Sequence, residues 1–244
     1  MDQLEDFADD RLINGCIYCG GPEETGDHVP SRVLLDEPLP ENLPIVAACR
    51  DCNNGFSSDE EYLACLIESV VAGTTDPAHI RRPRVAEILK RAPALRARLE
   101  AAKTTEDGQT KFHVEPDRVR NVLLKLARGH AAYELSQPCR HEPASLEWWP
   151  LSLMTEEERD SFQSVQVLET FGEIGSRQTQ RLMVTQIALE SENGGRTTLG
   201  LIINDWVEVQ EGRYCYQAID EGGSVRVKIT IGDYLACEVV WTDN

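Results

Sequence analysis

The sequence contains no long hydrophobic run, and no apolar stretch approaches the roughly 18 residues that a membrane-spanning helix needs. Its first six residues are acidic and lack the basic and apolar regions of a secretory signal. It also has no internal repeat and no low-complexity tract. We therefore expect a cytoplasmic protein with no membrane partner, in which cysteine thiols stay reduced.

Positive charge is scarce, and its distribution is uneven. The 244 residues carry a net charge of −18, which argues against a polyanionic partner because an acidic surface repels nucleic acid. Residues 1–75 hold 3 Lys and Arg against 16 Asp and Glu, residues 76–145 hold 14 against 9, and residues 146–244 hold 7 against 17. The basic middle block is either a nucleic-acid surface or a solvated helical face.

The first two of these segments have helical signals. Ser58-Asp59-Glu60-Glu61 forms a capping-box pattern, which predicts a helix from there to about Ala72. Residues 83–103 are rich in helix formers, but Pro93 should break or kink the helix. Residues 117–135 form an amphipathic pattern whose apolar face includes His130, which we expect to be a core residue. The opposite face, which we expect to be solvated, carries Arg118, Asn121, Lys125 and Arg128.

The last segment has a strand pattern. Runs rich in β-branched and aromatic residues are separated by short turns that contain Gly, Asn and Asp, which predicts an antiparallel sheet or meander. The predicted fold class is α+β, with an N-terminal metal-bound module, a helical middle segment and a β-rich C-terminal region of unknown role. The predicted strands cover residues 182–189, 198–203, 206–209, 214–219, 225–231 and 235–241.

Four of the eight cysteines stand in two Cys-x-x-Cys pairs. In a reducing compartment such pairs indicate a metal site before they indicate disulfides. Four thiolates complete a closed tetrahedral zinc site, so this zinc should be structural. A short segment with many loops and little apolar content needs such a staple, although four reduced core cysteines are the alternative. The predicted ligands are Cys16, Cys19, Cys49 and Cys52.

The residues between the two pairs carry further motifs. They contain Asp27-His28-Val29-Pro30 and Asn42-Leu43, and the second pair runs directly into Asn53. With these motifs, residues 14–61 resemble the HNH endonuclease family in its form with two Cys-x-x-Cys pairs. The resemblance implies a ββα-metal fold, similar to a treble clef, and a hydrolase that cleaves DNA. Phe56 departs from the pattern, because many members of the family have a lysine there.

The resemblance also implies a role for each matched residue. His28 corresponds to the general base, and Asn42 to the position that holds the histidine and its loop. Asp27 and Asn53 correspond to ligands of one catalytic divalent cation, Mg²⁺ or Mn²⁺, although Asn54 competes with Asn53 for that role. General chemistry agrees, because a neutral imidazole can accept a proton from water near pH 7 and Mg²⁺ prefers oxygen ligands.

The sequence thus predicts three regions and two alternative functions. Residues 1–75 would form the nuclease module, residues 76–145 a basic helical segment that contacts DNA, and residues 146–244 a β-rich region. The C-terminal region offers a surface for a protein partner or for homo-oligomerisation. The alternative is a non-catalytic zinc adaptor that binds protein or nucleic acid. The net charge of −18 favours the adaptor, whereas the filled Asp27, His28 and Asn53 positions favour the nuclease.

Overall fold

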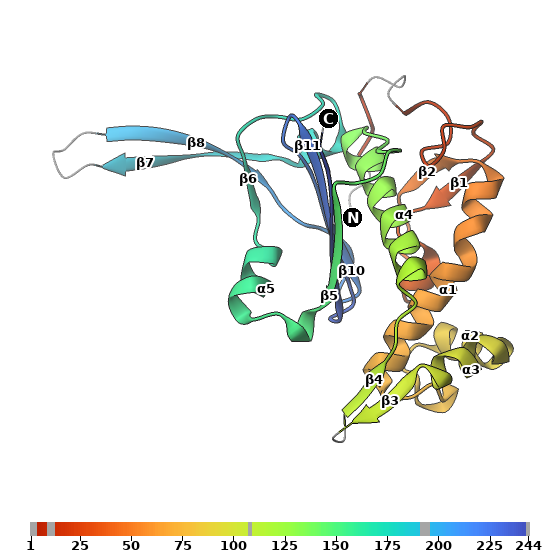
Figure 1. Cartoon of the computed structure of the whole chain (residues 1–244). Coiled ribbons are helices and arrows are strands. Elements are labelled where there is room, and N and C mark those ends of the chain that lie inside the picture. The colour runs from red at the N-terminus through yellow and green to blue at the C-terminus, as the bar shows by residue number, and fades with distance from the viewer. Residues whose placement is uncertain (1–3, 9–12, 107–108, 191–195, 243–244) are drawn as a thin grey trace.

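The computed structural model describes residues 4–8, 13–106, 109–190 and 196–242. Its fold class is α+β with antiparallel sheets, as the sequence predicts. The chain begins with two short antiparallel strands, β1 (Thr25–His28) and β2 (Ile45–Ala48), followed by the long helix α1 (Arg50–Ala72) (Figure 1). A 3-10 turn, η2 (Arg32–Leu34), lies between the two strands in sequence.

The N-cap of helix α1 lies nine residues before the predicted one, so the capping-box prediction at Ser58 is wrong. The N-cap is Cys49, whose Sγ accepts a hydrogen bond from the backbone N–H of Cys52. Ser58 lies inside the helix, where its side chain and carbonyl accept hydrogen bonds from Arg118. The cysteine turn thus supplies the cap that the sequence pattern assigned to a serine. The predicted end is confirmed, because Gly73 follows Ala72 in a left-handed conformation.

The middle of the chain is mostly helical. Pro93 separates α2 from α3, which confirms the predicted break. The long helix predicted over residues 117–135 is confirmed as α4. In chain order the elements are η3 (Pro77–His79), α2 (Pro83–Arg91), α3 (Pro93–Ala101), β3 (Lys103–Glu106), β4 (Gln109–Phe112) and α4 (Pro116–Leu135).

The C-terminal strands form two separate sheets. The larger has the order β5-β12-β11-β10-β9, which is an antiparallel meander with β5 added at its edge. The smaller has the order β6-β8-β7, and its β7–β8 hairpin extends away from the rest of the molecule (Figure 1). The elements are β5 (Ser145–Pro150), η4 (Leu151–Leu153), α5 (Glu156–Gln163), β6 (Gln166–Leu168), α6 (Arg177–Arg181), β7 (Met183–Glu190), β8 (Arg196–Asn204), β9 (Val207–Gln210), β10 (Tyr214–Asp220), β11 (Ser224–Ile231) and β12 (Leu235–Thr242).

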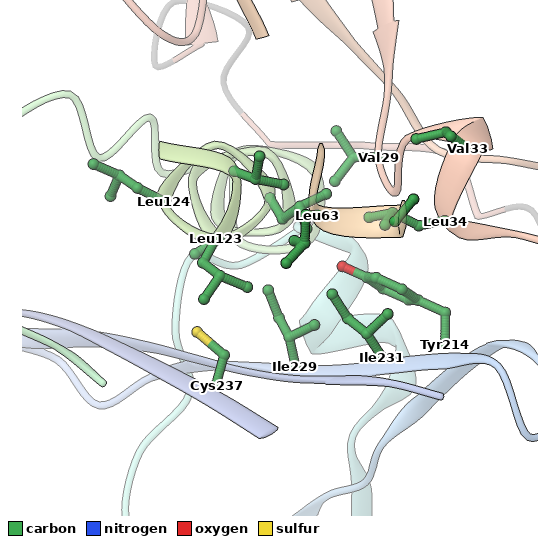
Figure 2. Close-up of a cluster of buried hydrophobic side chains, with 14 of the residues drawn as sticks. Val29, Val33, Leu34, Leu63, Leu123, Leu124, Tyr214, Ile229, Ile231 and Cys237 are labelled. Carbon is green, nitrogen blue, oxygen red and sulfur yellow. The ribbon is translucent and has the colours of Figure 1, made fainter. Parts of the chain in front are cut away.

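Helix α4 is the centre of the molecule. It packs against α1 on one side and against the five-stranded sheet on the other, so most of its surface is buried (Figure 1). Figure 2 shows the resulting core, in which Leu123 of α4 faces Ile229 and Cys237 of the sheet, with Leu63 of α1 close by. His130 is fully buried, as predicted, and its ring stacks on Tyr216 at 3.7 Å.

The predicted solvated face of α4 is wrong, because this helix has neighbours on both sides. Lys125 is 1% exposed. Arg118 stacks over the ring of Tyr62 and pairs with Asp59, while Arg128 donates hydrogen bonds to three backbone carbonyls of the segment after α4. Three basic side chains of the block that we expected to contact DNA therefore hold the fold together.

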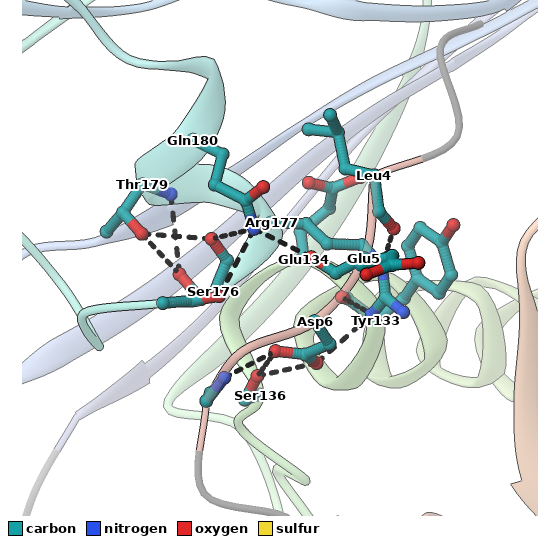
Figure 3. Close-up of polar contacts among 12 residues, drawn as sticks. Leu4, Glu5, Asp6, Tyr133, Glu134, Ser136, Ser176, Arg177, Thr179 and Gln180 are labelled. Atoms are coloured by element: carbon teal, nitrogen blue, oxygen red, sulfur yellow. Dashed lines mark hydrogen bonds and ion pairs between the residues drawn. The ribbon is translucent and has the colours of Figure 1, made fainter.

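The N-terminal segment is tied to the C-terminal half by polar contacts (Figure 3). Arg177 of α6 donates to the carbonyl oxygens of Leu4 and Tyr133, and pairs with Asp6 at 3.1 Å. Asp6 also accepts a hydrogen bond from Ser136 at the end of α4. Residues 4–8 thus bridge α4 and α6. Among the described helices, none is both long and apolar enough to cross a membrane.

Candidate metal centre and active site

The four paired cysteines come together, as predicted. Their Sγ atoms all lie within 4.8 Å of one another, and Cys19 Sγ and Cys49 Sγ are 3.7 Å apart. Tetrahedral zinc with Zn–S bonds of about 2.3 Å places its sulfur ligands roughly 3.8 Å apart. Thiols packed only as core residues do not need this spacing. The cluster could therefore hold a metal ion such as zinc.

Backbone N–H groups turn toward the cluster from both cysteine pairs. Gly21 donates to Cys19 Sγ and Cys52 donates to Cys49 Sγ, both at 3.4 Å. Burial raises the pKa of the Cys16 thiol, but hydrogen bonds from backbone N–H groups, that of Cys49 first, outweigh it and lower the pKa to about 7. These contacts favour the thiolate of Cys16, which is the form that binds a metal, whereas burial raises the pKa of the Cys52 thiol.

Asp27 and His28 end strand β1, beside a hollow of about 410 Å³ that both residues line together with Ser31, Arg32, Ser57, Glu60 and Arg84. Asp27 is 6% exposed, and its carboxylate accepts a hydrogen bond from Tyr18 Oη at 2.8 Å. The same carboxylate pairs with Lys125 Nζ at 3.0 Å. Asp27 therefore borders the hollow with most of its surface already engaged.

His28 is held in one orientation by Arg32. Arg32 Nη2 lies 2.8 Å from His28 Nε2, and because a guanidinium can only donate, Nε2 accepts and the proton of the neutral ring sits on Nδ1. Burial lowers the pKa of His28, and the charge of Arg32 lowers it further. The imidazole is thus neutral near pH 7, which is the state that a general base needs.

The other two predicted site residues, Asn42 and Asn53, do not line this hollow. Asn42 is exposed on the loop before β2, and no hydrogen bond among the described residues joins it to His28. Asn53, in the first turns of α1, directs its side-chain Nδ2 to the carbonyl oxygen of Gly26 at 3.3 Å and to Thr25 Oγ1. Asn53 is not among the residues that line the hollow.

These features can be compared with those of known proteins. No family model matches this chain. No curated protein and no solved structure is detectably similar to it either. The assignment of a function therefore rests on the residues and geometry of the chain itself.

Two residues that the sequence did not identify as site residues lie behind Asp27 at the edge of the hollow. Lys125 reaches Asp27 from α4, and Glu60 reaches the same ammonium from α1 at 2.9 Å. Glu60 also accepts a hydrogen bond from Ser31. The helical pattern gave no signal for Lys125, because its position suggested a solvated face.

Two arginines, also missed, fix the turn that carries Arg32: Arg82, which is buried, and Arg213, which is mostly buried. Arg82 donates to the carbonyl oxygens of Val33 and Leu35, and Arg213 donates to that of Leu34. Glu68 of α1 lies between them, 2.9 Å from Arg213 Nη2 and 3.9 Å from Arg82 Nε. Segments far apart in sequence thus set the backbone beside His28.

A second hollow, of about 800 Å³, lies elsewhere in the described part of the chain. It is between α5 and the face of the sheet turned away from α4, and its lining includes Trp149, Phe162 and Lys228. Lys228 is 6% exposed and donates to the carbonyl oxygen of Phe162 at 3.3 Å. The lining of this hollow contains no histidine or cysteine.

Proposed function

We propose that this protein is an HNH-type endonuclease that hydrolyses DNA phosphodiester bonds, with His28 as the general base. The observation that carries this proposal is the neutral His28 at the end of β1, beside a hollow in a β1–β2–α1 unit that the four-cysteine cluster staples. The succession of two strands and a helix is the order expected for a ββα-metal fold, which we propose for this unit, with zinc as the stapling ion.

The chain supplies two of the functions that hydrolysis requires. His28 Nε2 can accept the proton of an attacking water once Arg32 turns from the imidazole to the phosphate. Arg32 and Arg84 line the same hollow and can neutralise the charge of the phosphate group. Within residues 76–145, we therefore assign the proposed DNA contact to basic residues such as Arg84. Arg118, Lys125 and Arg128 are not part of it, because their side chains bind other groups of the protein.

A catalytic cation shared by Asp27 and Asn53 would require the Asp27 carboxylate to exchange its present partners. Tyr18 and Lys125 bind this carboxylate, whereas Asn53 uses Nδ2, and not the oxygen that a metal would take, to contact β1. When bound, a divalent cation would neutralise the phosphate and stabilise the leaving oxygen. The nuclease assay therefore needs Mg²⁺ or Mn²⁺ over a range of concentrations.

The test is nicking of supercoiled plasmid by the full chain and by His28→Ala, both with their metal content measured. We expect the wild type to nick and His28→Ala to lose activity with its fold and zinc content unchanged. Because burial and Arg32 lower the pKa of His28, the base stays neutral below pH 6.5, so activity should decline only at more acidic pH. His79→Ala, at an exposed histidine, is the matched control. His28→Ala nicking at the wild-type rate contradicts the assignment.

The alternative is a non-catalytic zinc adaptor. The closed contacts of Asp27 and the net charge of −18 favour it. A wild-type protein that holds zinc but nicks neither DNA nor RNA with Mg²⁺ or Mn²⁺ would support the adaptor and refute the nuclease.

A further inference from the structure

A buried ammonium occupies the inner wall of the candidate active site. Lys125 Nζ lies 3.1 and 3.0 Å from the two carboxylate oxygens of Asp27 and 2.9 Å from Glu60 Oε1. It also lies 2.9 Å from Ser31 Oγ and 3.2 Å from the carbonyl oxygen of His28. The Lys125 side chain has no exposed surface.

The five oxygen atoms around this ammonium form a cage suited to a cation. Carboxylate, hydroxyl and carbonyl oxygens are the ligands that Ca²⁺, Mg²⁺ and Mn²⁺ take in proteins. Ca²⁺–oxygen distances are about 2.3–2.6 Å, so the oxygens around Nζ would need to move inward by roughly half an ångström to bind it. They come from β1, the turn after it and α1, and so converge on one point from separate elements.

The charges inside the cage do not balance. Two carboxylates, those of Asp27 and Glu60, face one ammonium, and among the ion pairs of the described residues Lys125 is the partner of both. Removing the ammonium would leave a buried and a mostly buried carboxylate side by side, which is unfavourable unless another cation replaces it. A divalent cation would neutralise both.

We propose that Lys125 is the resident cation of this site and competes directly with a divalent cation for Asp27 and Glu60. In the conformation described here the lysine holds Asp27, and a metal ion gains this carboxylate only when the ammonium withdraws. This competition for the two carboxylates depends only on the cage. That it controls DNA cleavage rests on the proposed nuclease function.

The test uses Lys125→Met, which removes the charge and leaves an unbranched side chain one atom shorter. Mn²⁺ binding to the full, zinc-loaded chain is measured by electron paramagnetic resonance, and thermal unfolding is recorded with and without Mn²⁺. We expect Lys125→Met to bind one Mn²⁺ about tenfold or more tightly than the wild type, because the competing positive charge is gone. Mn²⁺ should also raise its melting temperature more than that of the wild type.

Two further variants locate the effect. Lys90→Met makes the same change at an exposed lysine and should leave Mn²⁺ binding at the wild-type level. The double variant Lys125→Met/Glu60→Gln removes one carboxylate of the cage and should lose most of the gained affinity. Should Lys125→Met be unfolded without metal, we expect Mn²⁺ to restore its circular-dichroism spectrum.

The proposal is overturned if Lys125→Met binds Mn²⁺ no better than the wild type, or if it is unfolded and Mn²⁺ does not restore it. Equal binding by the Glu60→Gln double variant would also overturn it, because the cage would then not be the site. Plasmid nicking is scored separately. A Lys125→Met protein that gains Mn²⁺ but does not nick supports the cage and counts against the nuclease.

Discussion

Removing the metal from the four-cysteine cluster should unfold the N-terminal unit. Residues 13–24 contain no long helix and no strand, and their link to the rest of the unit includes the sulfurs of Cys16 and Cys19. Cys16 is fully buried, so an empty cluster leaves thiols packed against one another in the core. Structural zinc contributes about 10 kcal/mol or more in small modules, which equals the whole stability of many domains.

The unit should therefore not survive without the ion, and the loss should reach α1, whose N-cap is Cys49. The measurement is elemental analysis followed by thermal unfolding with and without a strong chelator. We expect about one zinc per chain and a melting temperature that falls by many degrees when the ion is removed. Cys65→Ser, at a cysteine outside the cluster, should keep the zinc. A purified protein without bound metal, or an unchanged melting curve after chelation, would refute the reasoning.

Two stability predictions concern buried polar groups. Glu68→Gln removes the carboxylate charge beside Arg213 and should cost about 3–5 kcal/mol in urea unfolding, whereas Glu61→Gln, in an exposed pair, should cost less than about 1 kcal/mol. Equal losses would contradict a buried network. Burial holds the pKa of His130 well below 6.5. Below about pH 6.5 the unfolded chain is therefore protonated at this residue while the native protein is not, and stability is lost as the pH falls. The double variant His130→Phe/Tyr214→Phe, which removes both partners of their hydrogen bond, should lose that part of the pH dependence, up to about 1.4 kcal/mol per pH unit, between pH 7 and pH 5.5.

Local patterns predicted the secondary structure well where one interaction dominates. The alternating runs from Tyr214 to Trp241 became β10, β11 and β12 within a residue or two, and Pro93 ended a helix because it removes a backbone donor. The spacing of the cysteines predicted their cluster, because paired thiols on short turns can converge without help from distant parts of the chain.

The patterns failed where a distant segment decides the outcome. Ser58 opens a sequence pattern typical of a helix start. The cysteine turn nevertheless begins α1 earlier, and the hydroxyl of Ser58 accepts a hydrogen bond from Arg118. Lys125 occupies a polar position of an amphipathic helix, yet β1 and α1 enclose that position as well. The division of the strands into two sheets is likewise set by tertiary packing, which periodicity does not encode.

The position of α4 between α1 and the five-stranded sheet has a consequence for how this protein can evolve. A fragment that ends at residue 75 would lose Lys125 and keep Asp27 and Glu60, and it would expose the apolar side of α1 that α4 covers. The β1–β2–α1 unit is therefore not a domain that recombination can move alone between proteins. Any exchange that keeps Lys125 beside Asp27 and Glu60 must include α4, and α4 in turn needs the sheet on which it packs.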